Sequence, residues 1–102
     1  MITAIVQFDL PGDISSEQAK AMFQESAPRY RDMPGLVRKY YLFGNGKGGG
    51  VYLWESREAA EAVYGGVWLE NLRKLSGADP MITYFESPVI VDNTVGEIQV
   101  AA

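Results

Sequence analysis

The sequence predicts an α+β fold in which two helices pack on one face of a four-stranded antiparallel sheet. Three observations lead to this prediction. Strand and helix patterns follow the order β-α-β-β-α-β, which is the ferredoxin-like split βαβ arrangement. The chain has 102 residues, the length of one domain. Its central strands are apolar on both sides. We expect a single domain over residues 1–93 and a C-terminal tail over residues 94–102.

The first strand and the first helix have clear signatures. Residues 2–9 alternate, with one side formed by Ile2, Ala4, Val6 and Phe8. Ser15 is placed to cap a helix, with Gln18 in the capping-box position. The inner stripe of this helix has amphipathic spacing and consists of Ala19, Met22, Phe23 and Ala27. Pro28 ends or kinks the helix, because its ring clashes with the preceding turn.

Two further strands are expected around a glycine-rich segment. Residues 36–43 and 51–55 are rich in aromatic and branched side chains. The loop between them covers residues 44–50, and its Asn45-Gly46 pair favours a tight hairpin turn.

The second helix is expected to begin after Ser56, an N-cap residue. Gly65 and Gly66 interrupt it, and helical spacing resumes over residues 67–75 until Gly77 stops it. Residues 81–86 form the fourth strand, and residues 87–93 continue in an extended conformation.

The two-faced central strands predict self-association. In the second strand, Leu36, Tyr40 and Leu42 would oppose Val37, Tyr41 and Phe43. Helices cover only one face of such a sheet, so the other apolar face needs a second layer. We therefore expect a homodimer whose sheets face each other as a dimeric α/β barrel.

The composition excludes several classes of function. The chain contains no cysteine and no histidine, which excludes disulfides, the usual zinc sites and Ser-His-Asp catalysis. The net charge of −4 argues against a nucleic-acid partner. No apolar run is long enough for a membrane span, and the N-terminal segment lacks the features of a signal peptide. We expect a cytoplasmic protein without a zinc site of the usual kind.

A glycine motif invites a nucleotide-binding interpretation, because Gly44, Gly46, Gly49 and Val51 fit the pattern G-x-G-x-x-G-x-V. A dinucleotide site would need a helix after the glycines, but a strand follows here. A protein kinase would need a far longer chain with its lysine and aspartates. The glycines are therefore expected to close a flexible hairpin.

Three segments resemble one known family. These are "MPGLVRKYYLF", "GGVYLWESREAAEAVY" and "YFESPVIVDN". Together they resemble the YdhR-type putative monooxygenase family, which belongs to the dimeric α/β-barrel group together with the antibiotic-biosynthesis monooxygenases. The likeness spans residues 2–93. It implies a homodimer with a pocket between sheet and helices in each subunit, and oxygenation of an aromatic, quinol- or polyketide-like substrate without metal, flavin or haem.

The candidate site residues follow from this chemistry. Some relatives place a Trp and an Asn near an aromatic substrate; Trp54 lies on the corresponding strand, and Asn71 is the only Asn in a predicted helix. Without histidine, the base would be a carboxylate with a raised pKa, a tyrosinate, or the substrate's own ionisation. We expect catalytic roles for Trp54, Glu55 and Glu86. The expected substrate-binding residues are Tyr52, Tyr40, Tyr64, Trp68, Asn71 and Arg38.

Two alternatives remain open at the level of the sequence. The chain could be a non-catalytic binding protein for a small aromatic ligand, or an isomerase or cyclase that uses a carboxylate base. Tyr52 and Trp54 could line a pocket or the interface between subunits. A fold alone does not separate these functions, because function depends on the site.

Overall fold

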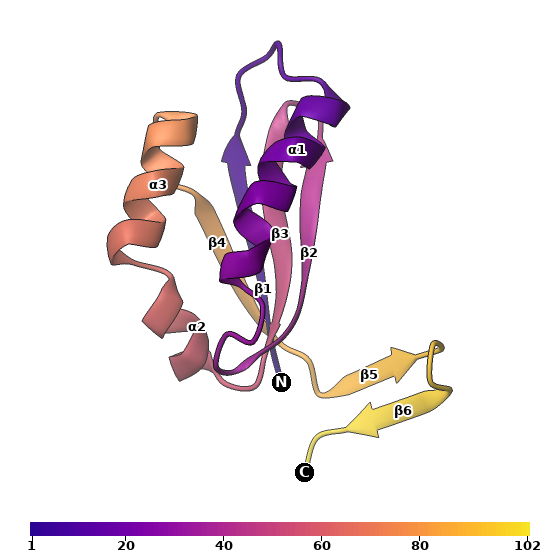
Figure 1. Ribbon diagram of the computed structural model, residues 1–102. Helices are drawn as coiled ribbons and strands as arrows, with labels where there is room; N and C mark the ends of the chain where they lie inside the picture. Colours follow the sequence, from indigo (N-terminus) through magenta and orange to yellow (C-terminus); the bar gives the residue numbers. More distant parts are fainter.

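The computed structural model describes residues 1–102 and confirms the predicted α+β, ferredoxin-like fold (Figure 1). The elements are β1 (Ile2–Asp9), α1 (Ser16–Ser26), the 3₁₀ helix η1 (Ala27–Arg29), β2 (Leu36–Gly44), β3 (Lys47–Trp54), α2 (Arg57–Val63), α3 (Gly66–Ser76), β4 (Met81–Glu86), β5 (Val89–Asp92) and β6 (Glu97–Val100).

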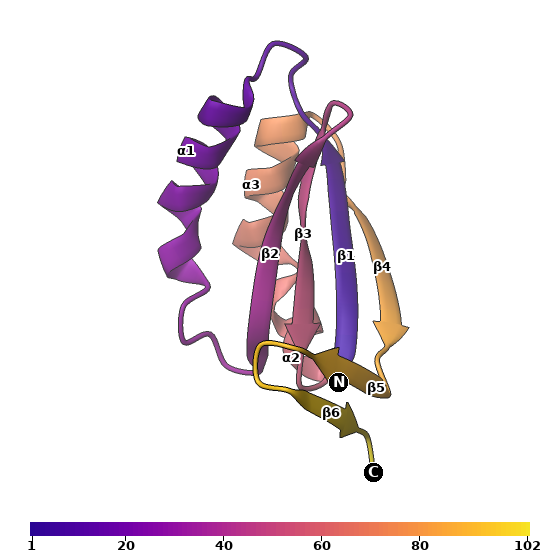
Figure 2. The ribbon, with the colours of Figure 1, turned by 90° about the vertical axis from the view of Figure 1, so that its right-hand side faces the viewer.

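The main sheet has the strand order β2-β3-β1-β4, and all neighbouring strands are antiparallel. Figure 2 shows both long helices, α1 and α3, on one side of this sheet. On that side lies a small buried core, which consists of Ala4 and Val6 of β1, Tyr52 and Trp54 of β3, and Ala60 of α2. The opposite face is left without a helical cover.

The start of α1 has the predicted capping box. The backbone N–H of Gln18 donates to Ser15 Oγ at 3.2 Å, and the backbone N–H of Ser15 donates to Gln18 Oε1 at 2.8 Å. These two bonds satisfy donors that the first helical turn leaves unpaired. The α-helix ends before Pro28, which lies in η1, as the proline predicted.

The predicted loop over residues 44–50 is wrong. The turn consists of Asn45 and Gly46 alone, with φ angles of 53° and 72°, so β3 begins at Lys47 rather than at Val51. A two-residue turn with positive φ at both positions matches the twist of antiparallel strands. The three glycines after it therefore lie inside a central strand, paired with β1 on one side and β2 on the other.

The prediction of which β2 side chains share a face of the sheet was wrong for Leu36. The register between β2 and β3 shifts between Leu36 and Arg38, which is a β-bulge. Leu36 pairs with Trp54 and therefore shares its side of the sheet, whereas the sequence pattern placed Leu36 on the side opposite Tyr41. A bulge inserts one residue and so reverses the alternation beyond it. Beyond the bulge, Lys39 and Tyr41 face the helices.

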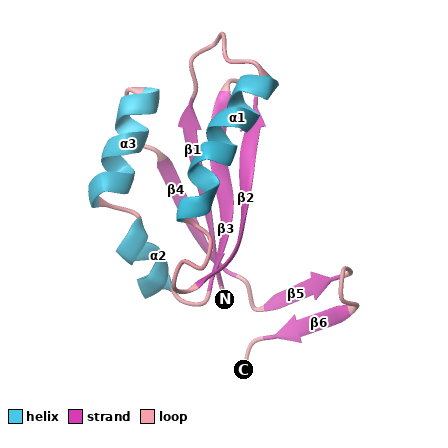
Figure 3. Cartoon of the chain, in the orientation of Figure 1, coloured by secondary structure: helices cyan, strands magenta, loops and turns pink.

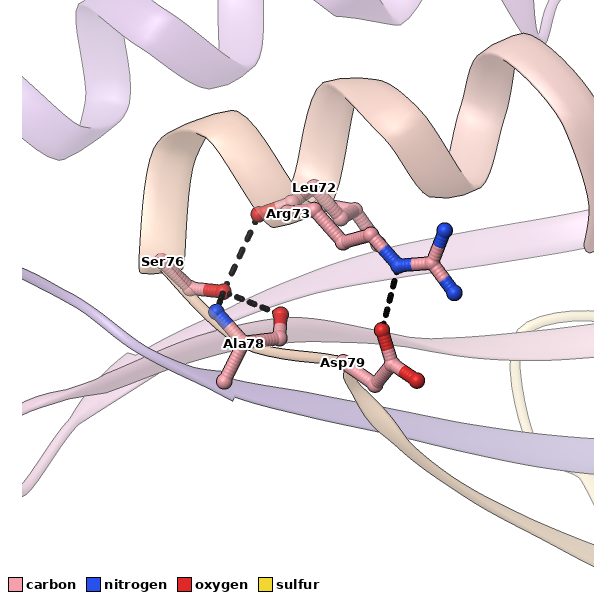
Figure 4. A network of polar contacts seen from close by, with 5 residues as sticks. All are labelled: Leu72, Arg73, Ser76, Ala78 and Asp79. Atoms are coloured by element: carbon pink, nitrogen blue, oxygen red, sulfur yellow. Dashed lines mark hydrogen bonds and ion pairs between the residues drawn. The ribbon is translucent and has the colours of Figure 1, made fainter.

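The break between α2 and α3 falls at the predicted glycines, and α3 ends at Gly77 in the left-handed conformation with φ of 80°. Figure 4 shows the contacts at this end. The Ser76 hydroxyl contacts the carbonyl oxygens of Leu72 and Ala78 at 3.0 and 2.8 Å, and Arg73 Nε donates to Asp79. The helix terminus is thereby fixed before the chain enters β4.

The C-terminal segment forms a hairpin that the sequence pattern did not indicate. Glu97–Val100 (β6) pairs with β5 in a two-stranded sheet of its own, which projects from the body of the molecule (Figure 3). Its large apolar side chains are exposed, namely Val89, Val91, Val95, Ile98 and Val100. No helix of the chain is long and apolar enough to cross a membrane.

Candidate binding cavity

A cavity of about 530 Å³ lies between the sheet and the helices. Its floor comes from β1, β2 and β3, and its walls come from α1 on one side and α3 on the other. The aromatic lining consists of Phe8, Phe23, Tyr30, Tyr41, Tyr52 and Trp68. Aliphatic side chains complete most of the wall, so the site has the apolar character typical of small-molecule pockets.

Hydrogen bonds hold the aromatic wall in place. Trp68 Nε1 donates to Tyr30 Oη at 3.0 Å and joins α3 to the segment after η1. Ser26 Oγ and Tyr41 Oη lie 2.7 Å apart and join α1 to β2. The rings of Phe23 and Tyr41 stack with centroids 4.7 Å apart. These contacts fix the wall from both helices.

The notable polar group of the cavity is Lys39 on β2. Its Nζ lies 3.4 Å from the ring centroid of Tyr30, 3.8 Å from that of Tyr41 and 4.6 Å from that of Tyr52. None of the four ion pairs in the structure includes Lys39. No carboxylate lines the cavity, and its only other cation is Arg29. The amine is therefore held by ring faces alone.

Burial lowers the pKa of Lys39 to about 7. The cause is desolvation, which disfavours the charged form of a buried amine. The ring faces act in the opposite direction, because they attract a cation. An amine with this pKa is present in both protonation states near neutral pH, whereas an ordinary lysine is almost fully charged.

Three buried tyrosines, Tyr41, Tyr52 and Tyr64, stay protonated. Burial raises the pKa of Tyr52, with a further contribution from neighbouring Tyr30. Burial also raises the pKa of Tyr41 and of Tyr64. Each hydroxyl therefore keeps its proton at neutral pH and can donate it in a hydrogen bond.

Gly50 has no side chain, and this leaves room for Lys39. A Cβ on Gly50 would lie 2.9 Å from a ring carbon of Tyr52 and 3.0 Å from Cε of Lys39. Both distances are shorter than an ordinary van der Waals contact. The absence of a side chain at Gly50, which pairs with Tyr41, thus leaves room for the Lys39 stem beside the Tyr52 ring.

Three of the candidate residues meet at this cavity. Tyr52 forms part of the floor, and Trp68 and Asn71 contribute from α3. Tyr52 is only 3% exposed within a single chain, so its ring faces the helices and not the open face of the sheet.

Trp54 and Tyr64 lie next to the cavity without lining it. Trp54 is fully buried, and its ring stacks on Tyr52 with centroids 5.9 Å apart. Its Nε1 donates to Tyr64 Oη at 2.9 Å. The pair supports the floor from the side of α2.

The remaining four candidates lie elsewhere. Tyr40 and Arg38 occupy the open face of the sheet, where Arg38 Nη1 contacts Tyr40 Oη at 3.4 Å and Arg38 pairs with Asp92 of β5 at 3.5 Å. Glu55 and Glu86 are exposed at the ends of β3 and β4. None of these four side chains lines the cavity.

Lys39 was not among the residues expected at the site. A signal for it exists in the sequence: Lys39 alternates with Tyr41 and Phe43, so a charged side chain shares the side of apolar aromatic neighbours. The sequence left three possibilities for the base: a carboxylate, a tyrosinate and the substrate's own ionisation. No carboxylate lines the cavity, and burial raises the pKa of Tyr41 and of Tyr52. No three acidic side chains gather to form a metal site.

Solved structures of other proteins share the fold of this chain. The chain matches no protein-family model and none of the curated proteins. Among solved structures it is similar to a monooxygenase from the gene ActVA-Orf6 of Streptomyces coelicolor in complex with the ligand nanaomycin D, with 18% identity, a TM-score of 0.65, and coverage of 84% of this chain and 86% of the other.

Two further structures have the same fold. One is an antibiotic biosynthesis monooxygenase, with 12% identity, a TM-score of 0.65, and coverage of 85% of this chain and 98% of the other. The second is described as a putative antibiotic biosynthesis monooxygenase from Deinococcus radiodurans, with 16% identity, a TM-score of 0.64, and coverage of 90% and 97%. The chain shares the fold of these proteins at low sequence identity.

Proposed function

We propose that this protein is a monooxygenase of the YdhR type that oxidises a small, electron-rich aromatic substrate in the cavity between sheet and helices. The observation that carries the proposal is the Lys39 amine, which lies on three tyrosine rings in an otherwise apolar cavity. The fold shared with proteins named as monooxygenases supports the same reaction class.

The chemistry begins with the substrate's own proton. A phenol or enol in the cavity donates its proton to the neutral amine of Lys39, and the resulting anion pairs with the ammonium group. The electron-rich anion then reduces molecular oxygen. For an anthrone-like substrate, a CH₂ group and O₂ give a C=O group and water, so the proposed reaction needs no metal, haem or flavin.

The walls supply binding and exclude water. Trp68 and Phe23 offer ring faces for stacking. Asn71 can donate or accept a hydrogen bond at the edge of the cavity. Tyr52 provides the rigid floor, and Trp54 and Tyr64 hold that floor in position. The isomerase alternative needs a carboxylate base, which the cavity lining lacks.

We also propose that the functional unit is a homodimer formed through the open face of the sheet. Large apolar side chains are exposed on that face, including Tyr40, Met81 and Phe85 at 57%, 67% and 52% exposure. The β5–β6 hairpin adds a second exposed apolar surface. A second copy of the chain would cover both.

Oxygen uptake tests the proposed reaction. A panel of hydroquinones and anthrones is offered to the wild type, to Lys39→Met and to the control Lys74→Met, whose side chain is exposed on α3. We expect kcat for the best substrate to fall about 100-fold or more in Lys39→Met, because the proton acceptor is lost. Lys74→Met should retain the wild-type rate.

Two results would count against the proposal. Tight binding of panel members without oxygen uptake would make the protein a binding module for aromatic ligands. Uptake that persists unchanged in Lys39→Met would show that the substrate ionises without this lysine.

A further inference from the structure

The amine of Lys39 has the placement of a nucleophile. It makes no ion pair, and its position is fixed by the faces of Tyr30, Tyr41 and Tyr52. It lines a cavity whose walls are suited to flat aromatic molecules. Asp32 lines a second, smaller hollow together with Lys39 but forms no ion pair with it.

The three other lysines of the chain differ in this respect. Lys20, Lys47 and Lys74 are exposed, and Lys47 pairs with Asp9 at 2.8 Å. An ordinary exposed lysine holds only roughly one neutral amine per thousand at physiological pH. A desolvated lysine in an apolar pocket is a far better nucleophile, because its neutral form is abundant.

The cavity also holds a proton donor for a carbonyl oxygen. Tyr30 Oη accepts a hydrogen bond from Trp68 Nε1, so its own proton is free to be donated. Ser26 lines the same cavity, but its hydroxyl already donates to the backbone carbonyl of Phe23 at 3.2 Å. An aldehyde oxygen that approaches Lys39 can therefore take a proton from Tyr30, whose ring contacts the amine.

We propose that the cavity captures aromatic aldehydes covalently and reversibly, with Lys39 as the attacking amine. The nitrogen lone pair forms a C–N bond to the carbonyl carbon, and the oxygen takes up a proton to give a carbinolamine. Loss of that hydroxyl with a proton, as water, forms the C=N bond of an imine. No oxidant or reductant takes part, so this reactivity is independent of the oxygenation proposed above, although both use the same cavity.

Reductive trapping tests this capture. The wild-type protein is incubated without oxygen at pH 7.5 with 2-naphthaldehyde and sodium cyanoborohydride, and peptide mapping by mass spectrometry locates the adducts. We expect Lys39 to be labelled at least about tenfold faster than Lys20, Lys47 or Lys74, as its larger neutral fraction predicts. The exposed α-amino group of Met1 is an internal comparator for accessible amines.

Competition shows whether labelling depends on the cavity. An excess of 2-naphthol, which has the same shape but no aldehyde, should slow labelling of Lys39 and leave that of Met1 unchanged. Labelling spread evenly over all four lysines, or labelling of Lys39 that 2-naphthol does not slow, would overturn the proposal. Because the assay excludes oxygen, trapping at Lys39 without any oxygenase activity would sustain this inference and refute the proposed function alone.

Discussion

At the residue scale, two opposing effects act on the pKa of Lys39. Removal from water disfavours the ammonium group, and three tyrosine faces favour it. Because the pKa of Lys39 is lowered, desolvation has the larger effect. The charged side chain therefore reduces the free energy of unfolding. Besides the tyrosines, the charged residues that line a hollow together with Lys39 are Arg29 in the cavity and Arg31, Asp32 and Arg38 in the second hollow.

This balance predicts a pH-dependent effect of Lys39→Met on stability. The pKa of Lys39 is lower in the folded chain than in the unfolded chain, so between about pH 7 and the unfolded value the unfolded chain binds more protons. Wild-type stability gains from rising pH over this window. The variant should therefore be stabilised relative to the wild type most strongly below pH 7, and this advantage should shrink toward pH 9.

Urea unfolding of both proteins at pH 6, 7, 8 and 9 measures the difference. Lys74→Met is the control, and its difference from the wild type should stay constant over this range because its side chain is exposed. A constant difference for Lys39→Met as well would show that the lysine is not desolvated.

At the element scale, β3 has an unusual start. Its first half is a run of glycines between two strands that pair closely with it. Gly49 has φ of 153°, and a Cβ there would lie 1.9 Å from the carbonyl oxygen of Val6. Gly50 leaves the space through which Lys39 reaches the cavity. The glycine run is thus a packing requirement of the central sheet.

Gly49→Ala is expected to destabilise the protein by about 3 kcal/mol or more, because the backbone of β1 cannot yield without breaking the sheet. Gly44→Ala is the matched control, since a Cβ at Gly44 meets nothing within 4 Å. Its effect should be within about 1 kcal/mol. Thermal and urea unfolding measure both. Equal effects of the two variants would contradict the close approach of β1 to β3.

The element scale also shows what could be predicted from the sequence. Periodicity and caps predicted the four strands of the main sheet, both main helices and the ends at Pro28 and Gly77, because these signals are local. The length of β3 was not predictable, since glycines carry no periodicity and their strand pairing is decided by neighbours distant in sequence. The bulge after Leu36 depends on the same long-range pairing.

The site was predictable only in part for a related reason. Tyr52 and Trp68 were candidates as aromatic side chains, and Asn71 was a candidate because of the family resemblance; all three line the cavity. The role of Lys39 arises from three rings that come from different segments, so no single stretch of sequence displays it. Glu55 and Glu86 had suitable chemistry at strand ends, but they lie outside the cavity.

At the scale of the whole molecule, the open sheet face and the hairpin remain uncovered in a single chain. Figure 2 shows the hairpin near one end of the sheet and no helix over the open face. Exposed apolar patches of this extent are typical of interfaces between subunits. The Arg38–Asp92 pair links the hairpin to β2 and so joins the two surfaces.

We expect the wild type to sediment as a dimer at micromolar concentration. Phe85→Glu should shift it toward monomer, because a carboxylate on the open face would be buried without a partner in the dimer. The control Ala62→Glu places the same charge on the exposed surface of α2 and should leave the dimer intact. Sedimentation velocity distinguishes the species. A wild-type monomer would refute the proposed assembly.

The positions of the two tryptophans have an optical consequence. Trp54 is sealed in the core, whereas Trp68 lies at the cavity wall with its indole N–H bonded to Tyr30. We expect an aromatic molecule that enters the cavity to change the emission of Trp68 more than that of Trp54, whereas unfolding exposes both indoles to water. Emission from Trp68 can therefore report on occupancy of the cavity, and emission from Trp54 on the folded state. Variants with a single tryptophan can separate the two signals.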